Sequence, residues 1–430
     1  MGIGHLYTSD RFLIRDSVHD YIVLDKEKFE FLLRVMDSFE FQRLRRIKQL
    51  GTTYFVYPGA EHSRFGHSIG AMWLAFQFGK KFKDDGVQID GDIMSKVVLA
   101  ALVHDIGHGP FSHVFEKITK YNHKEMTIRF IEERLAELVP TFSSKEIKKI
   151  LKKEVDSENV WVGDLLDSQI DVDRMDFLLR DSLYTGVDYG RFDMQRLFHS
   201  LIVGDIEGRN HLVMLLKGLH AFEGFFIAYH HMYWQVYFHK TTRVYEILLE
   251  KILRRMRDIL GELDIAIQPE LETLLTGEKL GLQEFFLLDD CTILETIKRC
   301  CSSRDEVLSD LSTRFLNRNV FKCVKKKKFE NIEIMFELYE KIRKFYEKRN
   351  ILQEYYFAID EPQKVSVRRP VLEKGLLMTD IDRFGKISEL FDFVDKSDII
   401  RSLYNVKHTE LRMYCPEHLV EELRKILSTI

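Results

Sequence analysis

Hydrophobic residues recur along most of the chain with the 3.6-residue period of an α-helix. This pattern predicts helices over residues 28–49, 67–81, 93–104, 171–184 and 218–253. The last of these is hydrophobic on all sides, which is typical of a central buried helix. Only seven prolines interrupt the 430 residues. We therefore expect a mainly α fold.

Two regions depart from the helical pattern. Residues 11–25 alternate between apolar and polar positions, which predicts a short hairpin or an extended arm. After about residue 265, the β-rich KVSVRRPVL (364–372) and a strand-then-helix pattern at 409–427 predict a small α+β appendage. We expect a helical core with an N-terminal arm at residues 1–265 and a helical and α+β module at residues 266–430.

Charge and cysteine content narrow the classes of function. The chain carries 64 basic and 68 acidic residues, a net charge of −4, so no general field attracts nucleic acid or a membrane. Five cysteines without CxxC spacing favour reduced thiols. No secretory signal is recognisable, and no apolar run reaches the roughly 20 residues of a spanning helix. We expect a cytoplasmic protein, in which any anion-binding site depends on nearby residues and not on the net charge of the molecule.

The stretch LVHDIGHGPFSH (102–113) places three histidines and an aspartate at the end of an apolar helix, where Gly107 is a candidate C-cap. A metal, a substrate phosphate or a hydrogen-bond network must compensate these polar groups. His67 and Asp173 are further candidate ligands. Imidazole and carboxylate together suit Mn, Fe, Ni, Zn or, less typically, Mg. Each residue alone is more often structural, but the joint pattern H…HD…D favours a metal site.

That order, with the segments FQRLRRIKQLG, YPGAEHSRFGHSIG, HDIGHGPFSH and DVDRMDFLLRDS, resembles the HD-domain phosphohydrolases. The resemblance is to their deoxynucleoside triphosphate triphosphohydrolase branch, which includes dGTPase-like enzymes and the vertebrate enzyme with a sterile alpha motif. It covers roughly residues 11–250, and no sterile alpha motif is expected before it. It implies a helical HD-domain core and hydrolysis of a deoxynucleoside triphosphate to the deoxynucleoside and triphosphate. One divalent ion would be held by His67, His104, Asp105 and Asp173, with additional Mg on the nucleotide phosphates.

The resemblance also assigns catalytic and substrate-binding roles. It implies that Arg64 grips an α-phosphate oxygen and that His123 is the general acid, with Glu116 holding its imidazole. Similar enzymes often have Asp where this chain has Glu116. The implied contacts with phosphates and sugar are His108, His113, Gln49, Leu50, Arg174, Asp181 and Tyr237.

Three positions after the last metal aspartate depart from the family pattern. An arginine used on the terminal phosphate is replaced by Tyr229, and a lysine and a tyrosine are replaced by Arg174 and Phe177. Other cations, such as Lys240 or Arg243, would then hold the triphosphate, or the substrate is a different phosphorylated molecule.

Regulation and assembly follow from the same resemblance. Asp37, Gln42 and Arg45 match a guanine-reading activator site, although the segment also reads as a buried amphipathic helix with structural ion pairs. We expect a nucleotide-activated homo-oligomer, a dimer or tetramer, and no membrane partner. KKKK at 325–328 is more often a solvated face. The alternatives are an HD-type nuclease or phosphohydrolase acting on single-stranded nucleic acid or another nucleotide, and a catalytically silent nucleotide-binding regulator.

Overall fold

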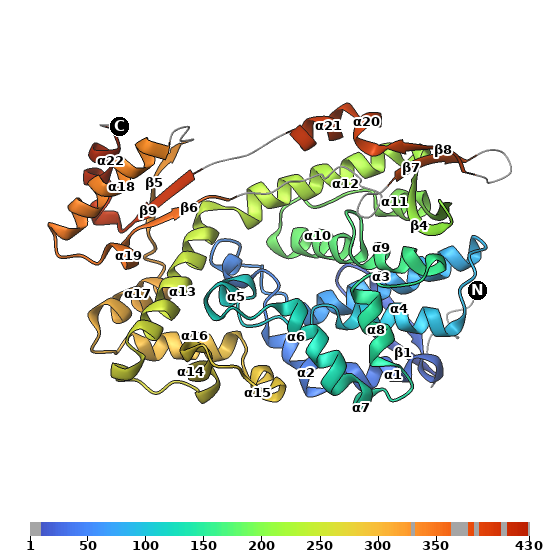
Figure 1. The fold of residues 1–430 in the computed structure, drawn as a ribbon, viewed down its shortest axis with the longest axis horizontal. Coiled ribbons are helices and arrows are strands. Elements are labelled where there is room, and N and C mark those ends of the chain that lie inside the picture. Colours follow the sequence, from blue (N-terminus) through green and yellow to red (C-terminus); the bar gives the residue numbers. More distant parts are fainter. Residues whose placement is uncertain (1–9, 328–331, 363–376, 382–386, 406–410, 429–430) are drawn as a thin grey trace. The chain divides into compact units, whose positions relative to one another are not determined.

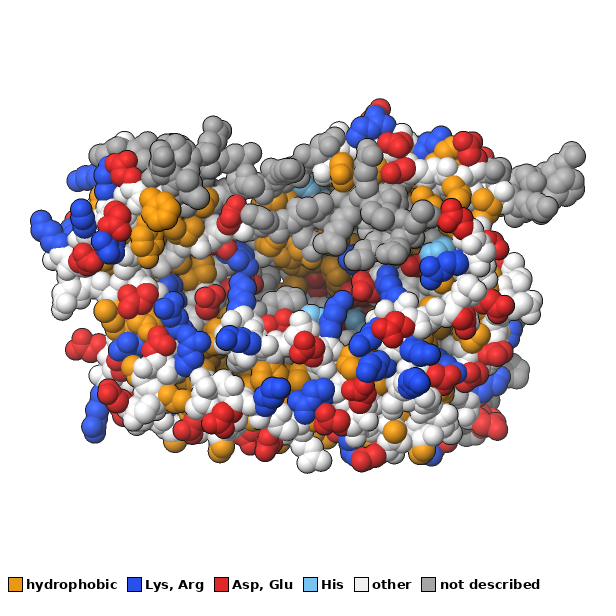
Figure 2. All heavy atoms as spheres, viewed as in Figure 1, with side chains coloured by type: hydrophobic (Ala, Val, Ile, Leu, Met, Phe, Trp, Pro, Cys, Tyr) orange, Lys and Arg blue, Asp and Glu red, His pale blue; other side chains and the backbone are white. Residues whose placement is uncertain are grey.

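The computed structural model describes residues 10–327, 332–362, 377–381, 387–405 and 411–428. Helices predominate, and the described strands form small sheets of two, four and three strands (Figure 1), which confirms the mainly α expectation. None of the described helices is both long enough and apolar enough to cross a membrane. Figure 2 shows the described acidic and basic side chains interspersed over the face in view, as the nearly balanced composition predicts.

The chain forms two compact units, each assembled from segments that are distant in sequence. The first comprises Met1–Ser112, Tyr121–Met232 and Ser366–Asn405, and the second comprises His113–Lys120, Tyr233–Val365 and Val406–Ile430. The expected domain boundary near residue 265 stays a prediction.

The first unit begins with the predicted hairpin. Strands β1 (Arg11–Asp16) and β2 (Asp20–Asp25) pair in antiparallel register, with Asp16 opposite Asp20 beside the turn. The alternating pattern is confirmed because Ile22 and Leu24 on one face of β2 are buried, whereas Tyr21 and Asp25 on the other face are exposed.

The single helix expected over residues 28–49 is wrong. The chain forms α1 (Lys26–Met36), then α2 (Phe39–Gln42) and a 3-10 turn η2 (Arg43–Arg46). Ser38 causes the break, because its hydroxyl donates to the Val35 carbonyl (2.7 Å) and accepts from the amide of Phe41 (3.3 Å). A serine that caps one helix end and starts the next competes with continued helix.

Three helices form the centre of the first unit. The long α3 (Arg64–Asp84) packs against both α4 (Gly91–Val103) and α10 (Val172–Thr185). The last two turns of α4, Val97–Val103, are almost completely buried. The N-caps Asp90 and Asp171 define where α4 and α10 begin. Further helices of this unit are α6 (His123–Phe130), α7 (Ala136–Leu138), α8 (Ser144–Leu151), α9 (Val160–Leu166) and α11 (Met194–Ser200).

A four-stranded sheet completes the first unit, and the sequence pattern did not predict its first hairpin. Its order is β3 (Leu201–Ile206), β4 (Arg209–Leu215), β7 (Leu377–Ile381) and β8 (Ile387–Asp392). Strands β4 and β7 are parallel, whereas the other neighbours are antiparallel. Helices α12 (Leu219–Met232), α20 (Phe393–Lys396) and α21 (Asp398–Asn405) also belong to this unit.

The continuous helix expected over residues 218–253 is also wrong. After α12 the chain makes a π-turn, η7 (Tyr233–Tyr237), and a new helix, α13 (Lys240–Asp258), begins. The amide of Phe238 bonds to the Tyr233 carbonyl (2.7 Å), and His239 caps the new helix by accepting from the amide of Thr241 (3.3 Å). Hydrophobic periodicity alone does not detect this change of winding.

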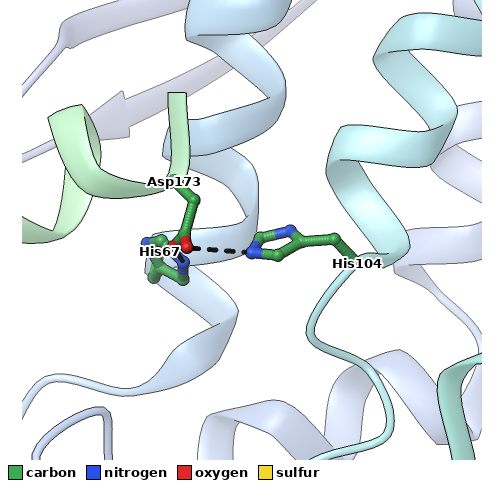
Figure 3. Close-up of side chains that lie close together, drawn as sticks. All are labelled: His67, His104 and Asp173. Atoms are coloured by element: carbon green, nitrogen blue, oxygen red, sulfur yellow. Dashed lines mark ion pairs between the residues drawn. The ribbon is translucent and has the colours of Figure 1, made fainter. Parts of the chain in front are cut away.

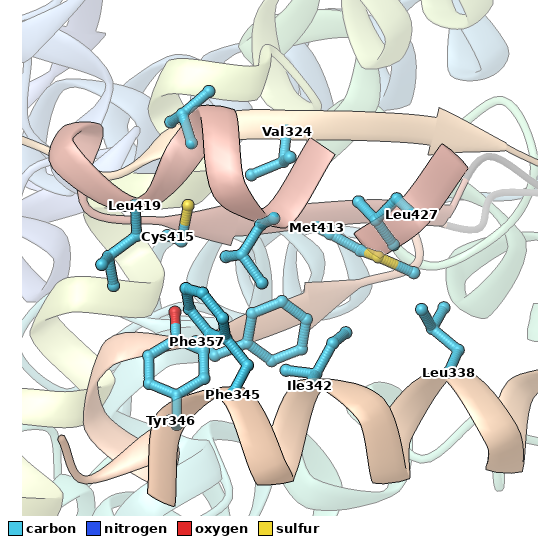
Figure 4. Packing of buried hydrophobic residues seen from close by; sticks show 12 residues of the cluster. Val324, Leu338, Ile342, Phe345, Tyr346, Phe357, Met413, Cys415, Leu419 and Leu427 are labelled. Carbon is cyan, nitrogen blue, oxygen red and sulfur yellow. The ribbon is translucent and has the colours of Figure 1, made fainter. Parts of the chain in front are cut away.

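The second unit packs short helices beside a three-stranded antiparallel sheet, β5 (Lys322–Lys327), β9 (Leu411–Cys415) and β6 (Ala358–Asp360). Figure 4 shows part of its core, where Ile342 and Phe345 on α18 (Ile332–Glu347) face Met413 on β9. KVSVRRPVL lies outside the described residues, as do the side chains of KKKK. The other helices are α5 (His113–Thr119), α14 (Pro269–Thr276), α15 (Leu282–Phe286), α16 (Asp290–Cys300), α17 (Glu306–Leu316), α19 (Gln353–Tyr356) and α22 (Val420–Ser428).

Candidate metal centre and active site

The histidine–aspartate pair lies directly after α4. His104 is the C-cap of this helix, and its Nδ1 lies 2.8 Å from the Ala101 carbonyl. The expectation that Gly107 caps the helix is therefore wrong. A Cβ on Gly107 would collide with the backbone of α6, so this glycine allows α6 to approach the turn closely.

Three helices bring the candidate ligands together, as Figure 3 shows for His67 on α3, His104 after α4 and Asp173 on α10. His67 Nε2 lies 3.1 Å from Asp173 Oδ1, and His104 Nε2 lies 3.7 Å from the same oxygen. The fourth candidate, Asp105, places one carboxylate oxygen 3.7 Å from His67 Nε2 and the other 3.4 Å from His104 Nε2. His67, His104 and Asp173 thus place one ligand atom each within 4.8 Å of one another, and the Asp105 carboxylate lies beside the two imidazoles.

The hydrogen bonds on the far side of each imidazole suit metal binding. His67 Nδ1 lies 2.8 Å from Asp176 Oδ2, and His104 Nδ1 faces the Ala101 carbonyl. Because an ionised carboxylate and a carbonyl only accept, both Nδ1 atoms carry the hydrogen, which leaves the Nε2 lone pairs for a ligand. Both Nε2 atoms are buried without a hydrogen-bond partner. Such orphaned acceptors, facing carboxylates, fit a divalent cation.

The charges at the centre support this interpretation. Burial lowers the pKa of His67, but the neighbouring Asp173 and Asp176 carboxylates outweigh burial and raise the pKa to about 10, so the metal-free imidazole takes up the proton that a bound cation would displace. Burial raises the pKa of Asp173, yet the neighbouring His104 and His67 imidazoles hold it below its ordinary value. The carboxylates thus stay charged, and their field attracts positive charge to this point.

Arg64 is held beside this centre at the start of α3. Its side chain is buried, Nε and Nη2 donate to Ser112 Oγ at 3.0 and 2.9 Å, and Nη1 donates to Asp105. Burial raises the pKa of Asp105, but the neighbouring His104 and the charge of Arg64 hold it well below its ordinary value. The guanidinium is therefore fixed next to a candidate ligand.

A pocket of about 730 Å³ reaches the centre within the first unit. Its lining includes His104, Asp105 and Asp173, together with His123 and cationic residues from α6 and the end of α8. This volume is in the range of small-molecule sites. A second imidazole cluster adjoins it: the His123 ring stacks on His108, with centroids 4.0 Å apart and planes 10° apart.

The helix that carries His123, α6, begins after an N-capping residue. Asn122 caps α6 by accepting from the amides of Lys124 (2.9 Å) and Glu125 (3.3 Å). His108 is buried, and its carbonyl accepts from Arg43 (2.8 Å). Burial and the charge of Arg64 hold the pKa of His108 well below its ordinary value, so this imidazole is neutral.

The residues expected to contact the sugar are partly buried near the loop before α3. Leu50 directly precedes the 3-10 turn η3 (Gly51–Phe55), and Gln49 Oε1 is buried without a hydrogen-bond partner. Asp181 is buried on α10 and lies 2.8 Å from His62 Nε2. His62 in turn stacks on Tyr184, with ring centroids 4.6 Å apart.

The positions that depart from the family pattern lie on α10 and α12. Arg174 pairs with Asp171 (2.9 Å), and its guanidinium lies 5.8 Å from the centroid of the Tyr229 ring. Tyr229 is buried, whereas Phe177 is half-buried. The charge of Arg174 thus already has an acidic partner.

Several expected site residues belong to the second unit, where they stay predictions. Glu116 lies on α5, Tyr237 in η7, and Lys240 and Arg243 at the start of α13. Arg243 there pairs with Asp360 (Nε to Oδ2, 3.1 Å). The side chain of His113 lies outside the described residues.

The expected activator residues lie close together around α2. Asp37 is exposed, and Gln42 donates to the Met36 carbonyl (2.7 Å) while accepting from Arg45 Nε (2.8 Å). The Arg45 guanidinium lies 3.6 Å from the centroid of the Phe65 ring. Nucleotide binding by these residues stays a prediction.

Sequence reasoning missed residues that support the candidate ligands. Asp176 bonds to His67, and it follows Asp173 by three residues, which is one face of the same helix. That spacing was a usable signal. Asn122 immediately precedes His123 at a helix start, where capping residues are common. Ser112 gave no comparable signal, because its contact with Arg64 depends on tertiary packing.

Comparisons with known proteins identify the family of this chain. A model of the HD domain matches residues 64–181, and a model of the HD associated region matches residues 192–430. Proteins with this domain form a class of helical phosphohydrolases, and the cluster of His67, His104 and Asp173 could hold the metal ion on which HD domains depend. The chain belongs to the HD-domain phosphohydrolase family within that class.

Individual relatives span most of the chain. The uncharacterized protein YwfO of Bacillus subtilis is 34% identical over 96% of this chain and 94% of its own length. The deoxynucleoside triphosphate triphosphohydrolase SAMHD1 homolog of Dictyostelium discoideum is 29% identical over 73% of this chain and 60% of that protein. A crystal structure of a phosphohydrolase from Bacteroides thetaiotaomicron superposes with a TM-score of 0.80 and 30% identity, over 95% of this chain and all of that one.

Proposed function

We propose that this protein hydrolyses deoxynucleoside triphosphates to deoxynucleosides and triphosphate. The observation that carries the proposal is the pair of buried, unbonded Nε2 atoms of His67 and His104, which face two charged carboxylates at the edge of a pocket. Relatives named as deoxynucleoside triphosphate triphosphohydrolases support the choice of substrate.

The proposed metal ligands are His67, His104, Asp105 and Asp173. Such a donor set suits one Mg, Mn, Fe, Ni or Zn ion. When bound, the ion would polarise a phosphoryl oxygen and lower the pKa of a water molecule. Additional Mg would accompany the nucleotide phosphates.

Arg64 is proposed to neutralise the α-phosphate. Ser112 holds two of its nitrogens, so the guanidinium loses little freedom when an oxyanion arrives. A preorganised cation next to the reacting phosphorus stabilises the charge that develops there.

His123 is proposed to protonate the leaving group. Water adds its oxygen to the α-phosphorus and releases a proton to the solvent, the bond to the 5′-oxygen breaks with its electron pair, and His123 donates a proton to that oxygen. Stacking on the neutral His108 fixes the plane of the His123 ring. Glu116 is proposed to hold this imidazole.

Substrate recognition is proposed for Gln49, Leu50, Asp181, His108, His113, Arg174 and Tyr237. The unbonded Gln49 Oε1 supports a polar ligand nearby, because a buried acceptor without a partner is costly. Activation by a nucleotide at Asp37, Gln42 and Arg45, and assembly into a dimer or tetramer, are proposed as well. Equal rates with and without guanine or deoxyadenine nucleotides would rule out activation.

A chromatographic product assay tests the function. Each deoxynucleoside triphosphate is supplied singly and in mixtures with Mg²⁺ or Mn²⁺, and a His104→Ala variant purified in parallel controls for contaminating phosphatases. Deoxynucleoside and intact triphosphate from the parent protein alone would support the proposal. A nucleoside monophosphate product or degraded oligonucleotides would favour the nuclease alternative, and nucleotide binding without turnover would favour a silent regulator.

A further inference from the structure

The Asp176 carboxylate, which supports the candidate ligand His67, has every acceptor position filled. It is fully buried on α10. Its Oδ2 accepts from His67 Nδ1 (2.8 Å) and Arg180 Nε (2.9 Å), and its Oδ1 accepts from His19 Nε2 (2.7 Å) and Arg180 Nη2 (2.8 Å). A carboxylate offers about four lone-pair sites, so no rotation of this group keeps all its bonds.

One of these donors comes from the N-terminal hairpin, more than 150 residues away in sequence. His19 stands in the β1–β2 turn, and its side chain is only 8% exposed. Asp16 shapes that turn, because its Oδ1 accepts from the amides of Val18 (2.8 Å) and His19 (3.0 Å). The Asp16 carboxylate also pairs with Arg180 (2.9 Å). Two contacts therefore hold the turn against α10, one between His19 and Asp176 and one between Asp16 and Arg180.

The third side of Asp176 is closed by the backbone of α3. A Cβ on Gly70 would overlap the Asp176 carboxylate and lie 2.5 Å from Arg180 Nη2. Gly70 is three residues after His67 on the same helix, so Asp176 sits against the helix that carries the ligand. The carboxylate is therefore confined by α3, α10 and the hairpin together.

We infer that the β1–β2 turn is part of the metal centre and that His19 is a positioning residue, which orients the His67 imidazole through Asp176. The inference rests on the proposed metal site. Without the His19 donor, Asp176 Oδ1 would keep a single partner, and the carboxylate could turn away from His67 Nδ1. Loss of a ligand's outer partner, here Asp176, typically weakens metal binding by about 10–100-fold, so loss of the His19 donor that orients Asp176 should fall at the lower end of this range.

Titration of Mn²⁺ alone into chelator-stripped, full-length protein tests the inference. His19→Leu removes the donor and should weaken Mn²⁺ binding by about tenfold or more. His19→Gln places an amide nitrogen near the original Nε2 position and should restore affinity to within about threefold of the parent. The thermal unfolding midpoint of each metal-free variant separates loss of folding from loss of the ligand's orientation.

His211→Leu is the matched control, because His211 Nδ1 pairs with Asp164 (3.0 Å) in the same unit without contacting the candidate ligands. It should bind Mn²⁺ like the parent. If His19→Leu also binds Mn²⁺ like the parent and only its thermal unfolding midpoint is lower, the turn merely stabilises the fold and the inference is wrong. If the parent binds none of Mn²⁺, Mg²⁺, Fe²⁺, Ni²⁺ and Zn²⁺ in the same titration, the proposed function fails together with the inference.

Should His19→Leu fail to fold, His19→Gln and His19→Asn provide the same comparison. The asparagine amide is one methylene shorter and does not reach Asp176, so His19→Asn should bind Mn²⁺ more weakly than His19→Gln. Equal affinities of these two variants would overturn the inference.

Discussion

Gly107→Ala tests whether the close approach of α6 to the histidine–aspartate turn sets the position of His123. The new Cβ would lie 2.8 Å from Thr127 Oγ1 and nearer still to the His123 carbonyl oxygen and the Thr127 amide nitrogen, whereas ordinary contact begins at 3.4 Å. Because two of these atoms are backbone, α6 must move by more than about 0.6 Å.

The expected cost has a structural and a catalytic part. Overpacking of a tight core costs about 1–3 kcal/mol in the free energy of unfolding. A displacement approaching 1 Å at a catalytic group can reduce the rate by about 100-fold. The candidate ligands His67 and Asp173 lie on other helices, so Mn²⁺ affinity should change far less than kcat.

The assay measures triphosphate release at saturating Mn²⁺ together with denaturant unfolding. Gly91→Ala is the control, because a Cβ there meets nothing within 4 Å. It should retain full activity and gain about 0.4–1 kcal/mol of stability. A Gly107→Ala protein with more than a third of the parent's activity would refute the requirement for this close approach.

Three further predictions concern the centre and the second unit. Asp105→Ala should lose bound metal and turnover together while staying folded, measured by metal analysis and circular dichroism; metal-dependent turnover in this variant would refute its assignment as a ligand. Arg64→Lys should lower kcat more than metal affinity, because Lys cannot keep the paired bonds to Ser112, and an unchanged kcat would contradict the proposed phosphate contact. Burial lowers the pKa of Lys251 from 10.5 to about 8, so the unfolded chain binds more protons between these pH values and stability rises with pH across this window. Between pH 8 and 10.5, urea unfolding should show the free energy of unfolding of the parent rising by about 3 kcal/mol relative to that of Lys251→Met. A difference between the two proteins that stays constant over this pH range would contradict the lowered pKa.

Local sequence signals account for much of the helical framework. The apolar run before His104 predicted a buried helix, and α4 is buried over Val97–Val103. The alternating pattern of residues 11–25 predicted the hairpin that the structure contains. These signals succeed because helix and strand periodicities act over a few residues. They failed at Ser38, where a side-chain cap ends one helix and starts the next, and at Tyr233, where the backbone hydrogen bond from Phe238 changes the winding of the helix.

The sequence by itself determined which residue types stand at the candidate centre, and its family resemblance named His67, His104, Asp105 and Asp173 as candidate ligands. Only the tertiary structure decided how they are supported. His67 meets Asp176 across 109 positions, and His19 meets it across 157. Such contacts carry no periodic signal, because they depend on the packing of α3, α10 and the hairpin against one another. A buried carboxylate needs partners for each lone pair, and only the folded chain brings those donors to it.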